Sequence, residues 1–367
     1  MSGRRPLALP DFPWDLVAPF AVTARAHADG IVDLSVGTPV DAVPAVVQAA
    51  LAATTNTPGY PATYGTARVR ESAAGWLHRR HGVTVEAANV LPIIGAKEFV
   101  AWLPTLLGLG AGDVVGVPAL AYPTYAVGAQ LARATAQVVE SAVSVGPAPV
   151  AMVWVNSPAN PHGQILGVEH LRKVVAWARD RGTIVVSDEC YLEFGWSGER
   201  PLSILHPDVC GDSAAGLLAV HSLSKRSNLA GYRAGFVTGD GSLVAELLEA
   251  RKHAGMIVPA PVQAAMVAAL DDDLHVDEQR ARYFARRSVL WSALEAAGFV
   301  VEHSAGGLYL WATRDEDCWE SVRWLAALGV LVAPGSFYGH AGRRHVRVAL
   351  TATDERVAEA ARRLTSL

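Results

Sequence analysis

Two hydrophobic patterns alternate along most of the chain. Short runs of β-branched and other apolar residues are followed by longer stretches in which apolar positions recur with helical spacing. Because strands that alternate with helices pair in parallel, this rhythm predicts a mostly parallel, seven-stranded α/β sheet covered by helices on both faces. The predicted strands are Val90–Ile94, Val114–Val117, Gln137–Val139, Ala151–Val155, Thr183–Ser187, Leu217–Val220 and Ala234–Val237. The helices expected between them are Lys97–Leu107, Thr124–Ala132 and Val168–Arg181.

The rhythm changes after Pro259. Two long helical patterns are followed by short strands and a closing helix, which predicts a smaller α+β domain. We therefore expect a large domain over residues 36–275 and a small domain formed by residues 1–35 and 276–367, with the Pro-rich stretch before Gly37 folded over one of them. The elements predicted here are helices Pro261–Leu270, Leu274–Ala297 and Asp354–Leu364, and strands Phe299–Glu302, Leu308–Ala312, Leu331–Ala333 and Val346–Leu350.

Composition narrows the class of protein. The chain has 367 residues, of which 51% are hydrophobic and 18% charged, so a disordered chain is excluded. A net charge of −4 gives no global reason to bind nucleic acid or an anionic membrane. No run of apolar residues is long enough to span a bilayer, and the Arg-containing N-terminus lacks the apolar core of a signal peptide. Three Cys without a C-x-x-C spacing argue against a disulfide framework or a structural metal site, and favour a reducing cytoplasm.

Polar clusters follow five of the predicted strands. Ligands of doubly wound sheets bind beyond the carboxyl ends of the strands, so these clusters are expected to share one site. Each has an ordinary explanation when taken alone: a strand-to-helix turn, a Tyr at the rim of the core, turn-forming Asn residues, a helix cap and a surface loop. The clusters are Gly95–Glu98, Pro118–Tyr125, Asn156–Gly163, Asp188–Tyr191 and His221–Gly235.

Lysine is rare in this chain, which has only four: Lys97, Lys173, Lys225 and Lys252. Lys173 and Lys252 fit ordinary helix faces. Lys225 instead follows a central strand, lies between hydroxyl residues and precedes Arg233 by eight positions. Nearby cations lower the pKa of an amine and make it nucleophilic. Together the clusters supply a phosphate cradle, a stacking ring, an amide, a carboxylate for a ring nitrogen and a reactive amine, which is the inventory of a pyridoxal phosphate pocket.

Three motifs carry a family resemblance. S-x-S-K-x5-G-x-R-x-G at Ser222–Gly235, N-P-x-G at Asn160–Gly163 and D-E-x-Y at Asp188–Tyr191 resemble those of the class I/II aminotransferases, which have the fold type I architecture of pyridoxal 5'-phosphate (PLP) enzymes. The resemblance runs from Leu34 to Arg347. Segments such as GYPATYGTARVRE, SDECYLEFGW and HSLSKRSNLAGYRAGF are most similar to the actinobacterial N-succinyldiaminopimelate aminotransferases of lysine synthesis.

The resemblance implies a role for each matched residue. Lys225 would bind the cofactor covalently and then shuttle the proton, and Asp188 would pair with the ring nitrogen. Tyr191 and Asn160 would bind the phenolate oxygen, and Arg347, with the backbone of Gly37, would clamp the substrate α-carboxylate. The remaining cofactor contacts would come from Tyr122, which stacks on the ring, and from the phosphate ligands Ala96, Lys97, Ser222, Ser224, Arg233 and Tyr60 of the neighbouring subunit of a homodimer. His162 replaces the usual Thr of the N-P-T-G turn.

Substrate and reaction class stay open at this level. The resemblance implies transfer of the glutamate amino group to N-succinyl-2-amino-6-oxopimelate, and a distal cation for such an acidic substrate could be Arg25, Arg68, Arg226 or Arg251. A different PLP reaction, such as β-elimination of a cysteine conjugate or decarboxylation, is the alternative, because fold does not fix reaction class. A PLP-sensing regulator would need a DNA-binding module, for which the stretch before Gly37 is short, and a dinucleotide-binding dehydrogenase would need a G-x-G-x-x-G that is not found after the first strand.

Overall fold

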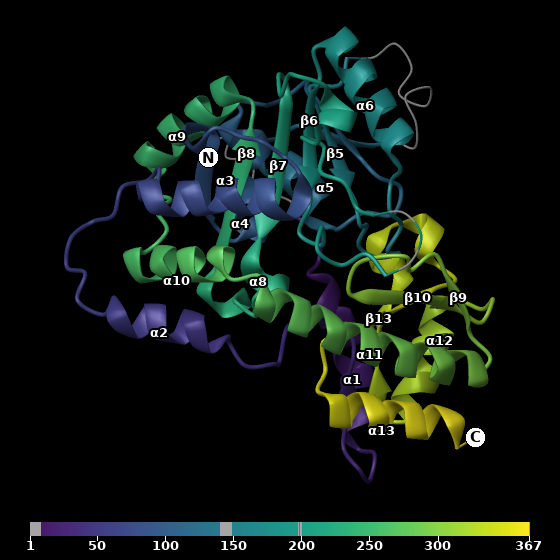
Figure 1. Ribbon diagram of the computed structural model, residues 1–367. Helices are drawn as coiled ribbons and strands as arrows, with labels where there is room; N and C mark the ends of the chain where they lie inside the picture. The colour runs from purple at the N-terminus through teal and green to yellow at the C-terminus, as the bar shows by residue number, and fades with distance from the viewer. Residues whose placement is uncertain (1–8, 140–148, 197, 199, 367) are drawn as a thin grey trace, which may run out of the picture.

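The computed structural model describes residues 9–139, 149–196, 198 and 200–366 (Figure 1). Residues 1–8 lie outside the described residues. The prediction that the N-terminus is not a signal peptide rests partly on them. No helix within the described ranges is long and apolar enough to cross a membrane.

The larger sheet has the predicted seven strands, in the order β2-β8-β7-β6-β5-β3-β4. Only β8 runs antiparallel to its neighbours, so the expected mostly parallel sheet is confirmed. The observed strands differ from the predicted ones by two residues or fewer at either end. Their bounds are β2 (Val90–Ile94), β3 (Val114–Val117), β4 (Thr135–Val138), β5 (Met152–Asn156), β6 (Ile184–Asp188), β7 (Leu217–Ser222) and β8 (Ala234–Gly239).

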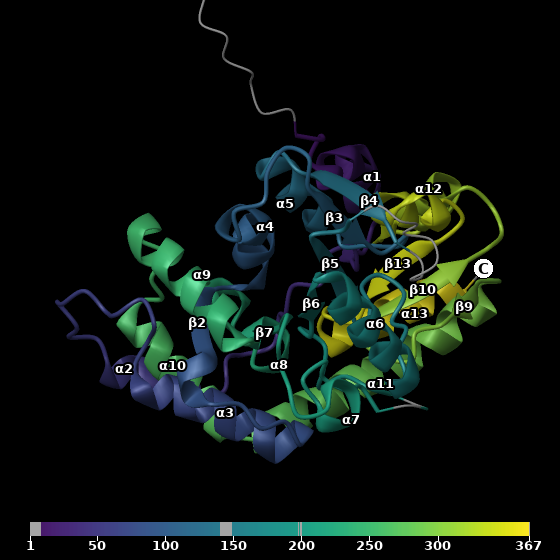
Figure 2. The same cartoon turned by 90° about the horizontal axis from the view of Figure 1, so that it is seen from above.

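Helices cover both faces of this sheet, because the apolar side chains of each buried strand point alternately to either side. On β5, Val153 and Val155 belong to a core shared with α3, α6 and α10, whereas Met152 and Trp154 belong to a core shared with α4, α5 and α9. Figure 2 shows α4 and α5 on one side of the strands and α3 and α6 on the other. The bounds are α3 (Ala67–His81), α4 (Ala96–Leu106), α5 (Thr124–Leu131), α6 (Val168–Arg181), α9 (Gly241–Ala254) and α10 (Ala260–Asp271).

The C-terminal part forms a separate four-stranded sheet in the order β12-β13-β10-β9, all antiparallel. The prediction of one strand over Leu331–Ala333 is wrong. The chain changes partners at Val332, so that β11 (Val330–Leu331) pairs with β1 (Val32–Asp33) and β12 (Ala333–Pro334) pairs with β13. The other elements here are β9 (Val300–Glu302), β10 (Tyr309–Thr313), β13 (Val346–Ala349), α11 (Leu274–Ala296), α12 (Cys318–Ala327) and α13 (Asp354–Thr365).

The N-terminal segment packs against this C-terminal part. In α1 (Ala18–Arg25), Ala21 and Ala24 are buried in one apolar cluster with Ala326 and Leu331. A second helix near the N-terminus, α2 (Ala45–Ala53), instead packs on α10. The chain therefore crosses from one sheet to the other between residues 34 and 45, next to the carboxyl ends of β5–β7 (Figure 1). The division at residues 36 and 275 stays a prediction.

Backbone hydrogen bonds join the two sheets close to those strand ends. Ser304 N donates to the His162 carbonyl at 2.8 Å, and Gly306 N donates to the Gly163 carbonyl at 2.8 Å. These bonds fix the turn after β5 against the loop that leads into β10. They hold β13 beside the carboxyl edge of the larger sheet.

Candidate active site

The turn after β5 is tied to the end of β6 by one buried side chain. The Asn156 amide donates to the Asp188 carbonyl at 2.9 Å, and its oxygen accepts from Asn160 N at 2.7 Å. Parallel strands end at the same edge of the sheet. Asp188 and Asn160, which are predicted to bind opposite parts of a cofactor ring, are therefore both held by Asn156.

The Asp188 carboxylate is buried and has two donors. Tyr125 Oη donates to its Oδ2 at 2.7 Å, and Cys190 N donates to its Oδ1 at 3.2 Å. Burial, together with the charge of Asp188, raises the pKa of Tyr125 well above its ordinary value, so the phenol stays a donor. No helix starts at this point, which removes the helix-cap interpretation of Asp188.

Lys225 lies in the single helical turn α8 (Leu223–Arg226), which starts where β7 ends. The Ser222 side-chain oxygen accepts from Ser224 N at 3.1 Å and caps this turn. Lys225 Nζ donates to the Gly37 carbonyl. Burial lowers the pKa of Lys225, and Arg347 and Arg233 act in the same direction. The amine is thus closer to its neutral, nucleophilic form than an exposed lysine is.

Gly37 is required by the close approach of Tyr309. A Cβ atom at this position would lie 2.1 Å from Tyr309 Oη. Tyr309 Oη is in turn 3.0 Å from Tyr191 Oη. Burial alone would raise the pKa of Tyr309, but Arg347 and Lys225 bring it below its ordinary value. Tyr191, Gly37 and Lys225 therefore meet around one phenol that the sequence analysis did not single out.

Arg347 is an interior residue. It is not a solvated charge on an edge strand, because β13 lies between β12 and β10 and Arg347 is 2% exposed. Its Nη1 donates to Asn160 Oδ1 at 2.9 Å, and its Nη2 donates to the Ser35 carbonyl at 2.7 Å. Its guanidinium carbon lies 3.9 Å from the ring centre of Tyr309 and 4.9 Å from that of Tyr338. Within the described residues, Arg347 Nε is buried and has no hydrogen-bond partner, so the fork has a donor to spare for a carboxylate.

A site suited to an anion lies at the start of α4. Gly95 has φ +75°, and a Cβ atom there would lie 2.3 Å from Arg233 Nη2, so only glycine lets the guanidinium approach this closely. No side chain caps the first N–H groups of the helix at Ala96. Free N–H groups beside a guanidinium suit a phosphate. These residues fit the phosphate of PLP. The Ser222 hydroxyl caps α8, and its contact with a phosphate stays a prediction.

Two predicted cofactor residues have further contacts. The Lys97 ammonium lies 5.3 Å from the ring centre of Phe12, so its side chain is engaged there. The backbone N–H of Lys97 is the group left to bind an anion at the helix start. Burial lowers the pKa of Lys97, and Arg233 adds to the effect. The Tyr122 ring packs edge-on against Tyr125, with centroids 5.8 Å apart, and burial raises its pKa to about 12. Stacking of Tyr122 on a cofactor ring stays a prediction.

Other predicted residues lie away from this cluster. Tyr60 is fully exposed between α2 and α3, and its contribution to a neighbouring subunit stays a prediction. Arg68 pairs with Asp271 on the surface. Arg226 is buried 3.7 Å from Glu193 and Arg251 is buried 3.5 Å from Glu98. These carboxylate partners make the three arginines poor candidates for the distal cation, and Arg25 is exposed at the end of α1.

The phenols that surround the predicted residues could not be singled out from the sequence. Tyr125 is the last residue of the predicted cluster Pro118–Tyr125, where its spacing of three from Tyr122 was the available signal. Tyr309 and Tyr338 lie in segments with the pattern of ordinary core. Tyr309 is on β10 and Tyr338 is in the short helix Gly335–Tyr338 that follows β12, and both strands pair with β13, which brings the two phenols to Arg347. Tyr309 faces Ala349 in that pairing, and Trp311 faces Arg347.

A reactive lysine, a buried carboxylate, an anion site at a helix start and a buried arginine at the edge of a seven-stranded sheet define a fold type I PLP-dependent enzyme. Residues 29–364 match the family "Aminotransferase class I and II", and the chain belongs to this family. Its members use pyridoxal 5'-phosphate and act on small amino and keto acids.

Relatives of the chain carry names that state different activities. The chain is 61% identical over 357 residues to 4-dedimethylamino-4-oxo-anhydrotetracycline transaminase OxyQ of Streptomyces rimosus, covering 97% of this chain and 99% of that protein. It is 63% identical over 359 residues to probable aminotransferase Rv1178 of Mycobacterium tuberculosis, covering 98% and 86%. The solved N-succinyldiaminopimelate aminotransferase of Mycobacterium tuberculosis superposes with a TM-score of 0.86 at 27% identity, covering 96% of each chain.

Proposed function

We propose that this aminotransferase moves the amino group of glutamate to a keto acid or semialdehyde, with N-succinyl-2-amino-6-oxopimelate as the physiological acceptor. When bound, PLP supplies an electrophilic carbon for the amino group and a ring that takes up electrons released at the substrate Cα. The residues described above would bind this cofactor and orient the substrate against it.

Lys225 is the proton carrier in this proposal. Its lowered pKa favours a neutral amine, which can take the proton from the substrate Cα and donate it again later in the reaction. Asp188, held by Tyr125 and the Cys190 amide, presents a carboxylate to the ring nitrogen and keeps it protonated. Tyr191 and Asn160 are positioned to hydrogen-bond the phenolate oxygen, and Gly95, Ala96 and Arg233 to hold the phosphate.

The observation that carries the proposal is the state of Arg347. A buried guanidinium with one unpartnered nitrogen, bonded to Asn160 and lying over Tyr309, is suited to a planar carboxylate close to Lys225. An α-carboxylate is common to every amino donor and keto-acid acceptor. This supports amino-acid chemistry but does not select the acceptor.

The choice of acceptor draws on similarity. The close sequence resemblance stated above and the likeness to a solved N-succinyldiaminopimelate aminotransferase support the diaminopimelate substrate. A second candidate acceptor is a polycyclic ketone of the anhydrotetracycline type, favoured by 61% identity to OxyQ over nearly the whole chain.

A panel of acceptors tests the proposal. Purified holoenzyme is incubated with glutamate and each acceptor, and both 2-oxoglutarate and the aminated product are quantified by mass spectrometry. We expect the highest kcat/KM with N-succinyl-2-amino-6-oxopimelate. A higher value with 4-dedimethylamino-4-oxo-anhydrotetracycline would move the assignment to the second candidate, and pyruvate and ammonia formed from a cysteine conjugate would favour a C–S β-lyase.

Assembly and location follow from the same reading. We infer a C2 homodimer in which Tyr60 of each chain completes the phosphate site of the other, consistent with the full exposure of Tyr60 in the single chain. We also infer a cytoplasmic enzyme, because Cys190, Cys210 and Cys318 are all free thiols.

A further inference from the structure

Tyr309 connects the two sheets at the candidate active site. It lies on β10 directly opposite Ala349 of β13, so Arg347 is its diagonal neighbour on the same face of the C-terminal sheet. Its hydroxyl reaches in another direction, to Tyr191, which follows β6 of the larger sheet. Tyr309 is 4% exposed, so its side chain is enclosed by protein.

The ring of Tyr309 lies against the Arg347 guanidinium. The guanidinium carbon is 3.9 Å from the ring centre, within the range of cation–π contacts. A ring in this position restricts the tilt of the guanidinium plane, and a two-pronged contact with a planar carboxylate depends on that tilt. The ring can therefore orient Arg347 without touching the substrate.

The hydroxyl of Tyr309 has little freedom. It is 3.0 Å from Tyr191 Oη, its only hydrogen-bond partner among the residues that the structure describes, and it abuts Gly37, where a side chain would collide with it. A phenol carries one proton. If Tyr191 donates its proton to the phenolate oxygen of the cofactor, Tyr191 Oη is left to accept from Tyr309. The two phenols then form a chain that fixes the direction in which Tyr191 donates.

The charges around Tyr309 favour it as the donor of this pair. Burial would raise its pKa, but Arg347 and Lys225 outweigh burial and bring the pKa below its ordinary value. The pKa of Tyr191 is instead raised, chiefly by burial. The more acidic of two phenols is the stronger hydrogen-bond donor, so Tyr309 is suited to donate to Tyr191.

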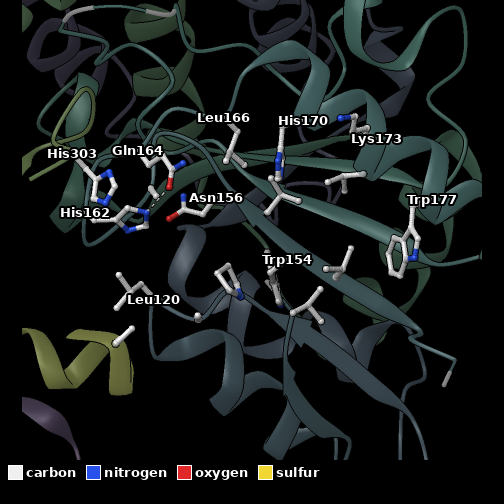
Figure 3. Close-up of a pocket in the computed structure, with 18 residues that line it drawn as sticks. Leu120, Trp154, Asn156, His162, Gln164, Leu166, His170, Lys173, Trp177 and His303 are labelled. Atoms are coloured by element: carbon white, nitrogen blue, oxygen red, sulfur yellow. Dashed lines mark hydrogen bonds between the residues drawn. The ribbon is translucent and has the colours of Figure 1, made fainter. Parts of the chain in front are cut away.

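The second residue proposed to bind the phenolate oxygen has a support of its own. Asn160 N donates to the side chain of Asn156, which borders a neighbouring cavity together with His162 (Figure 3). Arg347 holds the Asn160 side chain directly. In the part of the chain that the structure describes, the Tyr191 hydroxyl has only Tyr309 to hold it.

We propose that Tyr309 is a positioning residue of this active site: its hydroxyl orients Tyr191 toward the cofactor, and its ring orients Arg347 toward the substrate carboxylate. The inference rests on the proposed function for the roles of Tyr191 and Arg347, and it is independent of the acceptor. The two parts of the side chain can be removed separately, because phenylalanine keeps the ring and leucine keeps neither part.

The role of the hydroxyl is tested by the pH dependence of the visible spectrum of bound PLP, which needs no substrate. A hydrogen bond donated to the phenolate stabilises the deprotonated form, so its loss moves the midpoint of the spectral change to higher pH. We expect Tyr191→Phe to raise the midpoint by roughly one pH unit and Tyr309→Phe by roughly half a unit. Tyr309→Phe added to Tyr191→Phe should cause no further shift, because the two phenols act as one chain. The matched control is Tyr283→Phe, which removes a buried hydroxyl on α11 and should keep the native midpoint.

The role of the ring is tested with glutarate, an unreactive dicarboxylate that competes with glutamate. Inhibition should be unchanged in Tyr309→Phe and roughly threefold or more weaker in Tyr309→Leu, since only leucine removes the contact with Arg347. Retention of bound PLP is the check on folding.

A native midpoint in Tyr309→Phe would overturn the role of the hydroxyl. So would a shift of equal size in the Tyr191→Phe background, because Tyr309 would then not act through Tyr191. Native inhibition by glutarate in Tyr309→Leu would overturn the role of the ring. A native midpoint in Tyr191→Phe would contradict the proposed role of Tyr191 together with this inference, whereas a wrongly assigned acceptor would change neither measurement.

Discussion

Tyr125 donates a 2.7 Å hydrogen bond to the Asp188 carboxylate, which positions the group expected to hold a cofactor ring nitrogen. Asp188→Ala should lower the rate of the glutamate half-reaction far more than it lowers PLP occupancy, because the ring loses its proton partner. Tyr125→Phe should give a smaller loss of roughly 0.5–1.5 kcal/mol, the contribution of one hydrogen bond. Stopped-flow absorbance measures both. Near-native turnover in Asp188→Ala would remove the residue from catalysis.

Lys225 should be the covalent attachment point of the cofactor. Lys225→Ala should abolish the visible absorbance that borohydride traps in the native enzyme, since no other amine of the site replaces it. Lys97→Ala is the matched control and should keep the trapped absorbance. Peptide mapping of the reduced protein identifies the labelled residue, and a label on Lys97 would contradict the assignment.

Arg347→Lys should weaken all amino and keto acid substrates alike, by roughly 1.5–3 kcal/mol in kcat/KM, because lysine cannot form a planar two-pronged contact. PLP binding should be unchanged. Steady-state kinetics with glutamate and with a neutral amino acid provide the measurement. A loss confined to glutamate would assign Arg347 to the distal carboxylate instead.

Tyr60 should act across a subunit interface. Tyr60→Phe should raise the PLP dissociation constant by roughly tenfold or more, the effect of losing a hydrogen bond to a charged group. Mixing this variant with Lys225→Ala chains should restore native sites, up to about a quarter of the total when hybrid dimers form at random. Equilibrium dialysis and activity assays follow the restoration. An active species that sedimentation shows to be a monomer would exclude a shared site.

His221 should make stability depend on acid. It is 2% exposed, its Nε2 lies 3.6 Å from Glu189 Oε2, and burial lowers its pKa to about 3. Because the folded-state pKa lies below the unfolded value of about 6.5, the unfolded chain binds the proton first as pH falls. This group therefore reduces the free energy of unfolding between about pH 6.5 and 3, by about 2 kcal/mol at pH 5.

His221→Gln should remove that acid-dependent loss. Chemical denaturation at pH 7.5 and pH 5 compares the variant with the native protein. Glu189, whose pKa burial raises to about 7, acts in the opposite direction in the native protein. Because Glu189 lies 3.6 Å from His221, the difference between the two proteins reports His221 together with its contact to Glu189. Equal pH dependence of the two proteins would contradict the prediction.

Local pattern was sufficient for the strands of the larger sheet and for the residues at strand ends, whereas helices such as α2, α3, α9 and α12 were not predicted. Six of the seven strands of the larger sheet contain continuous apolar runs, the exception being the edge strand β4 with the sequence TAQV. Asp188 stands out at the end of one such run, and Lys225 in the turn that follows another. The break at Val332 was not predictable, since VLVAP is uniformly apolar and only the tertiary pairing separates β11 from β12. Tyr309 and Tyr338 were missed for a related reason: a buried tyrosine gives the same sequence signal whether it fills the core or borders a site.

Arg347 donates to the Ser35 carbonyl, and Lys225 donates to the Gly37 carbonyl. The short segment of residues 35–37 thus joins the site from far upstream, 312 positions before the arginine that contacts it. During synthesis, this segment leaves the ribosome long before its partner on β13 exists. The proposed carboxylate clamp at Arg347 can be completed only after nearly the whole chain has been made, so in this proposal substrate binding reports that residues 35–37 and β13 have met.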